Sequence, residues 1–295
     1  MIKQCLQQNA QAVEEALARS LPPKGGLQER VVEAMEYALL GGGKRIRATL
    51  VLEFCRACGV KDNRAMPLAC AVEMVHAYSL IHDDLPCMDD DDMRRGKPSC
   101  HKAFGEDIAL LAGDGLLSLA FDTLLGADAR SIGALNLLCA ARELAQASGA
   151  RGMVGGQVID LLSEGKKIDR PTLDAMHRGK TGAMIVVSAL LGCYAAGAGA
   201  AQRDAARAYA SRIGMVFQIV DDILDVEGDA ALLGKPIGSD AENQKTTFYT
   251  LLGPDRARAE AARLTEEAKE ALQKVFGGEA ETLCQLADFL LQRQS

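Results

Sequence analysis

The residues most suggestive of chemistry form an acidic segment, residues 82–95, which reads HDDLPCMDDDDMRR. Six of the ten residues from 83 to 92 are aspartates. Carboxylates packed this closely repel one another unless protons or cations neutralise them, and hard divalent cations such as Mg²⁺ take oxygen ligands. An acidic turn in open solvent is the simpler interpretation of most charge runs. The apolar run AVEMVHAYSLIH before it favours a protected site, because such a helix would deliver Asp83 and Asp84 into the protein.

The spacing within this segment does not suit a straight helix. Asp83 and Asp89 lie six residues apart, so at about 100° per residue a regular helix would turn their side chains away from each other. Pro86 lies between them and cannot donate a backbone hydrogen bond. We therefore expect a kink or bulge at Pro86 that brings both carboxylates to one side.

A second acidic segment, FQIVDDILD at residues 217–225, has helical spacing. Its polar residues stand at i, i+3, i+4 and i+7 on one helical face, and they are Gln218, Asp221, Asp222 and Asp225. A solvated amphipathic face is one interpretation. Two aspartate-rich helices in one chain favour a shared site for several metal ions, because buried carboxylates need partners.

Basic residues accompany both acidic segments. Lys44 and Arg47 follow three glycines, three residues apart, at a predicted helix N-terminus, which attracts anions. Ordinary surface basic residues are the alternative there. His76 lies seven residues before Asp83 on the same helical face and should point into the same cavity, although an isolated histidine is more often a core residue. The other polar candidates are Arg94, Arg95, Lys180, Thr181, Lys235 and Lys245. Two acidic surfaces and two sets of bases predict binding of two diphosphates.

The elements that must position these residues are predicted to be helices. The chain lacks Trp, is poor in strand-favouring residues and is rich in Ala, Leu, Glu, Gln and Arg. Helical periodicity with glycine and proline breaks predicts roughly ten to twelve helices. No break resembles an interdomain linker, so residues 1–295 are predicted to form one large all-α helical bundle. The longest irregular stretch, residues 227–243, is predicted to be a loop, and a loop of this length is usually either functional or mobile.

Composition excludes several other classes. A net charge of −7 argues against nucleic acid as a partner. Nine scattered cysteines and an N-terminus without a secretory core predict reduced thiols and a cytoplasmic protein. Residues 181–202 carry no charge and could span a membrane by length, but their glycines favour a buried core helix ending near Tyr194. We therefore expect no stable membrane insertion.

Seven motifs in order along the chain closely resemble those of the trans-prenyl diphosphate synthases, in particular the bacterial farnesyl diphosphate synthases. They are GGGKRIR (41–47), HAYSLIHDDLPCMDDDDMRRGKPSCH (76–101), GGQVID (155–160), GKTG (179–182), FQIVDDILD (217–225), LGKPIGSD (233–240) and QKTTF (244–248). The resemblance implies an all-α bundle around a deep central cavity, and a homodimer. It also implies condensation of isopentenyl diphosphate with dimethylallyl or geranyl diphosphate, releasing diphosphate.

The resemblance also implies roles for the candidates, which are matched motif by motif. About three Mg²⁺ ions, or Mn²⁺ in their place, would be held by Asp83, Asp84, Asp89, Asp221, Asp222 and Asp225. The allylic diphosphate would be bound by Arg94, Lys180 and Lys235, with Lys245 nearby. Isopentenyl diphosphate would be bound by Lys44, Arg47, His76 and Arg95. The nascent cation would be lined by oxygen dipoles of Thr181 and Gln218.

Product length is the finest expectation. In this family a bulky aromatic residue upstream of the first acidic motif is associated with stopping at fifteen carbons. Tyr78 lies there, five residues before Asp83, with Ser79 one turn below that aspartate. A farnesyl diphosphate synthase is therefore predicted, unless Tyr78 serves only as core packing. The alternatives are a geranylgeranyl or geranyl diphosphate synthase, or a non-catalytic subunit of a heteromeric synthase.

Two further classes fit the residues less well. A class I terpene cyclase would show a different second metal motif and more aromatic residues than the 12 present here. In a Cys/His metal protein, Cys55 and Cys58 would need a matching second pair, and Cys100-His101 stands alone in the sequence.

Overall fold

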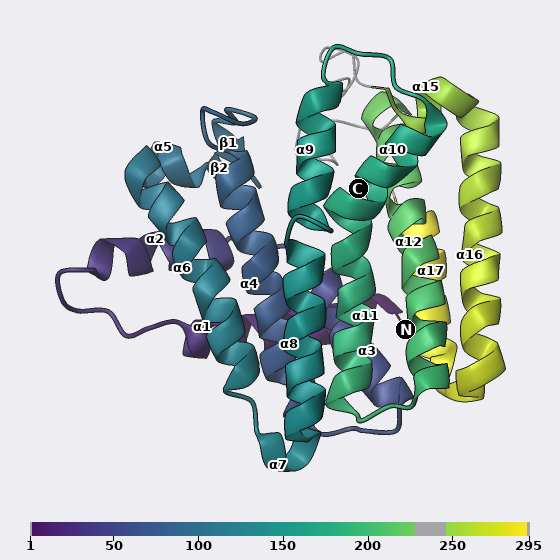
Figure 1. The fold of residues 1–295 in the computed structure, drawn as a ribbon, viewed down its shortest axis with the longest axis horizontal. Helices are drawn as coiled ribbons and strands as arrows, with labels where there is room; N and C mark the ends of the chain where they lie inside the picture. Colours follow the sequence, from purple (N-terminus) through teal and green to yellow (C-terminus); the bar gives the residue numbers. More distant parts are fainter. Residues whose placement is uncertain (1, 228–245, 294–295) are drawn as a thin grey trace.

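The chain forms a helical bundle in the computed structural model, which describes residues 2–227 and 246–293 (Figure 1). The elements up to the first acidic segment are α1 (Ile2–Ser20), α2 (Glu29–Leu39), α3 (Ile46–Ala57), η1 (Asn63–Ala65) and α4 (Met66–Asp83). The next are β1 (Met93–Arg94), β2 (Lys97–Pro98), α5 (Cys100–Phe104), α6 (Glu106–Leu125), α7 (Ala129–Ile132), α8 (Ala134–Ser148) and α9 (Met153–Ser163). The last are α10 (Arg170–His177), η2 (Arg178–Gly182), α11 (Ala183–Ala195), α12 (Ala200–Glu227), α15 (Phe248–Leu252), α16 (Pro254–Phe276), η3 (Gly277–Ala280) and α17 (Glu281–Leu291). The predicted all-α class is confirmed.

The long helices pack side by side and carry the two acidic segments at separate places. α4 contacts α6 and α3, α3 contacts α11, and α12 lies between α11 and α16. Figure 1 shows α4 and α6 on one side of the bundle and α12 and α16 on the other, with α8, α9 and α11 between them. The first acidic segment follows α4, and the second lies in the last turns of α12. The helices between α4 and α12 therefore set the distance between the two acidic segments.

Two helices that are apolar on every side form the centre of the core. α4 and α11 bury most of their side chains, as expected of helices without a polar face. Gly192 lets α11 approach α3, because a Cβ there would lie 2.3 Å from the carbonyl oxygen of Val51. The predicted core helix ending near Tyr194 is thus present as α11, which ends at Ala195.

A different helix meets the length and composition of a membrane span. Within the described ranges that helix is α6, of which only 33% of the apolar window is buried. It packs on α4 and α2, while Leu110, Leu111 and Leu125 remain exposed. An exposed apolar face of this kind is typical of a protein–protein contact.

Candidate active site

The first acidic segment forms a turn beyond the end of α4. The backbone N–H of Asp89 donates to the carbonyl oxygen of Asp83 at 2.9 Å, so the chain folds back on itself. The predicted kink or bulge at Pro86 is wrong, because the helix stops at Asp83 and the proline follows it. Burial, aided by the charge of Asp89 and opposed by that of Lys180, raises the pKa of Asp83 to about 6. The turn nevertheless brings Asp83 and Asp89 close enough to interact.

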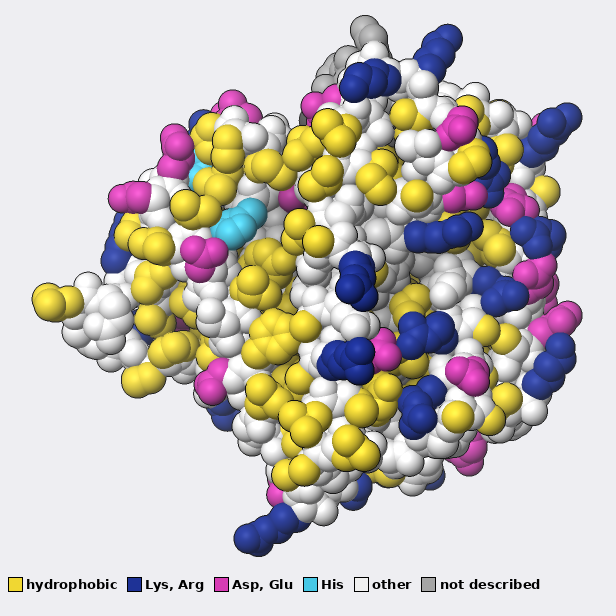
Figure 2. Space-filling model, in the orientation of Figure 1, with side chains coloured by type: hydrophobic (Ala, Val, Ile, Leu, Met, Phe, Trp, Pro, Cys, Tyr) yellow, Lys and Arg dark blue, Asp and Glu magenta, His cyan; other side chains and the backbone are white. Residues whose placement is uncertain are grey.

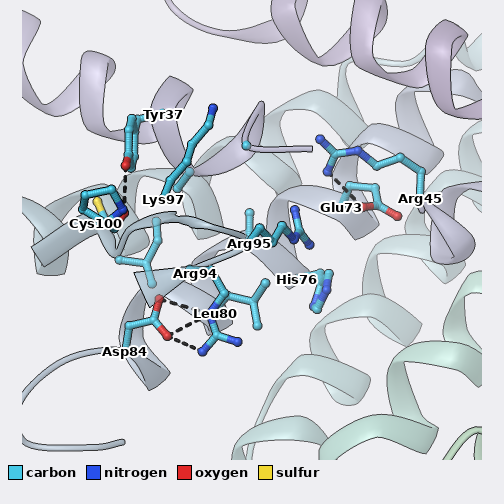
Figure 3. A pocket seen from close by; sticks show the side chains of 15 residues that line it. Tyr37, Arg45, Glu73, His76, Leu80, Asp84, Arg94, Arg95, Lys97 and Cys100 are labelled. Atoms are coloured by element: carbon cyan, nitrogen blue, oxygen red, sulfur yellow. Dashed lines mark hydrogen bonds and ion pairs between the residues drawn. The ribbon is translucent and has the colours of Figure 1, made fainter. Parts of the chain in front are cut away.

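Asp84, the neighbour of Asp83, is held by an arginine. The Nε of Arg94 donates to Oδ1 and Oδ2 of Asp84 at 3.0 and 3.3 Å (Figure 3). Nη2 of Arg94 also donates to Oδ2 of Asp91 at 3.2 Å. Asp84 is only 2% exposed. Burial raises the pKa of this carboxyl and the contacts with Arg94 partly offset the rise. Arg94 thereby anchors the acidic turn to the hairpin that follows it.

The β1–β2 hairpin places Arg95 at its tip. Met93 pairs with Pro98 and Arg94 with Lys97, so Arg95 and Gly96 form a two-residue turn, and both have positive φ. This is the geometry of a type I′ turn, which matches the twist of a hairpin. The side chain of Arg95 returns to the glycine loop before α3, where its Nη1 donates to the carbonyl oxygen of Gly42.

The second acidic segment forms the wall of a cavity of about 350 Å³. Its lining includes Gln218, Asp221, Asp222 and Asp225 from α12, Lys180 and Thr181 from η2, and Arg47 and His76. The helical spacing therefore places the predicted polar stripe on one surface, and three of the predicted diphosphate-binding bases, Arg47, His76 and Lys180, line the same cavity. The apolar neighbours Ile219, Val220 and Ile223 face the core.

Two aspartates of this segment have protein partners. Oδ2 of Asp222 accepts from the backbone N–H of Phe248 at 2.6 Å, which ties α12 to the start of α15. Oδ1 of Asp221 accepts from Nη2 of Arg293 at 2.9 Å. Arg293 also donates to the carbonyl oxygen of Phe217 at 2.8 Å and lies over its ring at 3.8 Å. The C-terminal arginine, which sequence reasoning missed, thus covers one end of the acidic stripe.

Lys180 connects the two acidic segments electrostatically. Its Nζ donates to Oδ2 of Asp160 at 2.5 Å. Burial lowers its pKa, but the charges of Asp160, Asp83 and Asp89 outweigh burial and leave the pKa raised. Lys180 therefore stays protonated beside the first segment while lining the cavity of the second.

The turn that carries Lys180 and Thr181 is π-helical, and the regular helix α11 begins after it, at Ala183. A π turn commonly marks a functional site. It packs directly on α9, because Gly156 has no side chain and a Cβ there would lie 1.9 Å from the backbone nitrogen of Lys180. The motif GGQVID thereby gains a physical explanation: Gly156 permits the contact and Asp160 pairs with Lys180. The motif was recognised in the sequence, but no role was predicted for Asp160.

The four residues predicted to bind isopentenyl diphosphate line a second cavity, of about 600 Å³. They are Lys44, Arg47, His76 and Arg95. Burial and the surrounding arginines, Arg47 first, lower the pKa of His76 well below its ordinary value, so its imidazole is neutral. Arg47 and His76 line both cavities, which places the two predicted diphosphate sites next to each other.

A buried ion pair holds the basic loop in place. Nη1 of Arg45 lies 3.3 Å from Oε2 of Glu73, and its Nη2 donates to the carbonyl oxygen of Leu39 at 2.7 Å. Oε1 of Glu73 accepts the backbone N–H of Ala48 at 3.0 Å, in the first turn of α3. Lys44 and Arg47 were expected together at the N-terminus of one helix. Arg47 lies in α3, but Lys44 precedes it, because the helix begins at Ile46. Arg45 and Glu73 are 28 residues apart and both are buried, so only the folded structure reveals this pair.

The remaining candidates lie along α4 or outside the described residues. Tyr78 is 7% exposed, its pKa is raised by burial and by the charge of Asp83, and its ring meets that of His82 edge-on at 5.7 Å. The Ser79 hydroxyl donates to the carbonyl oxygen of His76 at 2.9 Å. Lys235 and Lys245 fall in the range 228–245, which lies outside the described residues.

The donor set fits hard divalent cations. Asp83, Asp89 and Asp221 offer oxygen ligands only, which Mg²⁺ and Mn²⁺ accept. The raised pKa of Asp83 reflects burial and a neighbouring carboxylate, and a bound cation would relieve both effects.

Comparison with known proteins gives a consistent picture. The polyprenyl synthetase family model matches residues 28–281. The chain is 45% identical to farnesyl diphosphate synthase of Escherichia coli, over 95% of this chain and 94% of that protein. It is 42% identical to heterodimeric geranylgeranyl pyrophosphate synthase large subunit 1 of Arabidopsis thaliana, over 97% of this chain and 78% of that protein. The crystal structure of an FPP/GFPP synthase from Zymomonas mobilis superposes with a TM-score of 0.87 at 39% identity, over 98% of both chains.

Proposed function

Because the chain belongs to the polyprenyl synthetase family and is a prenyltransferase, we propose that it is a farnesyl diphosphate synthase. It would join isopentenyl diphosphate to dimethylallyl diphosphate and then to geranyl diphosphate, releasing diphosphate each time. The observation that carries this proposal is the pair of adjacent cavities that share Arg47 and His76, one lined by aspartates and the other by basic residues. Such a pair accommodates two diphosphates side by side.

Metal ions, a lysine and two oxygen dipoles would each stabilise a different charge that develops when the allylic diphosphate ionises. About three Mg²⁺ ions held by the two acidic segments would neutralise charge on the leaving diphosphate. Lys180, which stays protonated beside Asp83 and Asp160, stabilises the same leaving group as the allylic carbon–oxygen bond breaks and its electron pair departs with the diphosphate. Thr181 and Gln218, which line the same cavity, present oxygen dipoles to the allylic cation.

Condensation then uses the second cavity. Lys44, Arg47, His76 and Arg95 hold isopentenyl diphosphate so that its double bond faces the cation. The double bond forms the new carbon–carbon bond, and the released diphosphate accepts the proton that is lost. Arg47 orients the substrate without acting as a base, because it stays charged.

Tyr78 supports a fifteen-carbon product. It lies on α4 five residues before Asp83, about 7.5 Å along the helix axis at 1.5 Å per residue, and its bulk is buried. A chain growing from the metals along α4 would meet this ring. The relatives include both farnesyl and geranylgeranyl synthases at similar identity, so a twenty-carbon product is the second candidate.

A product assay separates these candidates. Labelled isopentenyl diphosphate is incubated with geranyl or farnesyl diphosphate and Mg²⁺, and products are separated by chromatography. We expect wild type and Tyr78→Phe to stop at farnesyl diphosphate, and Tyr78→Ala to make geranylgeranyl diphosphate or longer. A twenty-carbon product from wild type would favour the second candidate. No condensation by the wild-type protein alone would indicate a subunit that needs a partner.

We also propose that the protein is a homodimer. Exposed apolar side chains gather over α6, α8 and α9 (Figure 2), and they are Leu110, Leu111, Leu125, Leu135, Leu138, Val154, Val158, Leu161 and Leu162. Covering such a patch with a second copy removes it from water. Light scattering after size exclusion should give a dimer for wild type and for the control Leu27→Glu, and a monomer for Leu138→Glu. A monomeric wild-type protein would contradict the proposal.

A further inference from the structure

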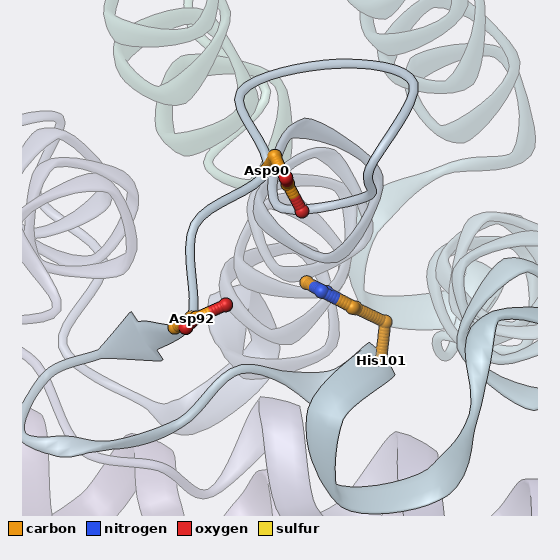
Figure 4. A group of neighbouring side chains, drawn as sticks. All are labelled: Asp90, Asp92 and His101. Carbon is orange, nitrogen blue, oxygen red and sulfur yellow. The ribbon is translucent and has the colours of Figure 1, made fainter.

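Three side chains outside the predicted metal set converge beside the first acidic segment. Asp90 and Asp92 come from the turn after α4, and His101 comes from α5 (Figure 4). One potential ligand atom from each lies within 4.8 Å of the others. None of the three was assigned to either diphosphate or to Mg²⁺. The cluster therefore needs an explanation of its own.

The histidine gives the strongest indication of a missing partner. His101 is 5% exposed, and among the described residues its Nε2 has no hydrogen-bond partner. A buried nitrogen without a partner is costly, and such atoms in native proteins usually have one. Nδ1 lies 3.1 Å from the hydroxyl of Ser99, which is 1% exposed. When Nδ1–H donates to that hydroxyl, the lone pair of Nε2 is left to bind a ligand.

This second hydrogen bond is the one that metal-binding histidines typically make. A group that accepts from one ring nitrogen fixes the tautomer and the ring orientation, so that the other nitrogen can ligate. Ser99 fills that position here, because it is buried and two residues from His101. Ser99 therefore holds the imidazole in one orientation, in which a ring nitrogen lies within 4.8 Å of a carboxylate oxygen of Asp90 and of Asp92.

Asp92 retains an oxygen for a metal ion. Oδ1 of Asp92 contacts Nζ of Lys102 at 2.7 Å, so its other oxygen is not used by that ion pair. The side chains of Asp92 and Lys102 are 72% and 43% exposed, and both can adjust. Two ligands on one metal lie roughly 3–3.5 Å apart when each bond is about 2.0–2.2 Å. The observed limit of 4.8 Å is thus within reach of small side-chain rotations.

From this geometry we propose that Asp90, Asp92 and His101 bind a first-row transition metal ion of the zinc class. One imidazole and two carboxylates form a mixed nitrogen and oxygen set, which suits Zn²⁺ or Co²⁺ better than Mg²⁺. Water would fill the remaining coordination positions. The ion would tie the turn that carries Asp89 to α5, next to the predicted Mg²⁺ site and separate from it.

The experiment observes the histidines directly. The chain has four histidines, so long-range ¹H–¹⁵N spectra of the labelled imidazoles report on each separately. Zn²⁺ is titrated in the presence of excess Mg²⁺, which occupies the all-oxygen sites, and without substrates. We expect Zn²⁺ to shift the ring nitrogens of His101 and to leave those of His76 and His177 unchanged. Unchanged His101 signals, or a response of His82 instead, would overturn the proposal.

Variants test the ligand set by the Zn²⁺ dissociation constant. His101→Asn and Asp92→Asn should each weaken binding by at least about tenfold, since even outer partners of a metal ligand contribute about 10- to 100-fold. Asp91→Asn is the matched control: it removes a carboxylate of the same turn that contacts Arg94 rather than the cluster, and it should leave Zn²⁺ affinity unchanged. Asp92→Asn also covers the case in which the buried histidine variant does not fold. Equal affinity in wild type, His101→Asn and Asp92→Asn would refute the site.

Discussion

The first acidic segment begins with the last residues of α4 and continues in the turn after it, whereas the second lies within the regular helix α12. In the turn, Asp84 is bound by Arg94 and Asp83 lies near Lys180. In the helix, Asp222 is bound by the backbone of Phe248 and Asp221 lies next to Arg293. In each adjacent pair the second aspartate is buried, with Asp84 2% and Asp222 5% exposed, whereas the first is only partly buried. Similar sites thus arise from different backbones.

The largest expected effect tests whether both segments serve one metal site. Asp83→Ala and Asp221→Ala should each lower turnover at least about 100-fold, since removing one preorganised charge-stabilising group costs roughly 10²–10³. EDTA should abolish activity, and Mg²⁺ or Mn²⁺ should restore it. The measurement is the steady-state rate at saturating substrates.

The control for this comparison is Glu270→Ala, a carboxylate with a side chain 66% exposed on α16, which should leave turnover unchanged. Circular dichroism verifies that each variant is folded. Full activity in EDTA, or a large loss in only one of the two aspartate variants, would separate the segments and contradict a shared site.

The next prediction separates the two diphosphates. Arg47→Ala should raise KM for isopentenyl diphosphate about 10- to 100-fold, because a hydrogen bond to a charged group contributes about 1.5–3 kcal/mol. Lys180→Ala should mainly lower the rate of ionisation, measured by single-turnover kinetics. KM for the allylic substrate is the internal control in the Arg47 variant. An increase confined to that substrate would reverse the assignment of the two cavities.

Sequence spacing predicted the site where the backbone is regular and failed where it is not. The stripe from Gln218 to Asp225 follows from helical periodicity alone, and its four polar residues line one cavity. The turn at Asp89 depends on where α4 ends, which periodicity does not determine. The wrong expectation of a bulge at Pro86 arose from extending the helix through the acidic residues.

Other contacts were invisible in the sequence because their partners are far apart along the chain. Asp160 meets Lys180 across 20 residues, Arg45 meets Glu73 across 28, and Arg293 meets Asp221 across 72. Cys100-His101 was set aside as an isolated pair, whereas the hairpin brings His101 next to Asp90 and Asp92. Tertiary contacts of this kind are set by helix packing, and single-sequence patterns do not encode them directly.

A smaller effect distinguishes the two aspartates of the second segment by stability. Asp222→Ala should lower the free energy of unfolding by about 1–3 kcal/mol, because it leaves the N–H of the fully buried Phe248 without an acceptor. Asp221→Ala should cost less than about 1 kcal/mol, since the side chain of Asp221 is 40% exposed and its ion pair is partly screened. Urea unfolding of the metal-free protein measures both. Asp222→Asn, which retains an acceptor oxygen, should recover part of the loss, and equal stability of the two alanine variants would contradict the clamp.

The smallest expected effect concerns pH and again distinguishes the second segment from the first. His177 stacks on Phe248 with ring centroids 5.2 Å apart and lines the acidic cavity. Burial lowers its pKa to about 4, with Asp160, Asp174 and Asp221 opposing the shift and Lys180 adding to it. The unfolded chain therefore binds more protons than the folded protein between about pH 6.5 and pH 4, so stability falls as pH is lowered through this range.

Replacing the imidazole by a ring that does not titrate isolates this contribution. His177→Phe keeps a ring against Phe248 but cannot bind a proton, so its free energy of unfolding should lack the histidine component. Between pH 7 and pH 6 the wild-type protein should lose about 0.7 kcal/mol more than the variant, and the gap should widen toward pH 5. Urea unfolding at each pH, without metal, gives the two curves. Their difference cancels Asp83, whose raised pKa acts in the opposite direction in both proteins because its neutral form is favoured by folding. Parallel curves would mean that His177 binds its proton equally well in the folded and the unfolded chain, which would contradict a buried, neutral imidazole in the wall of the second segment.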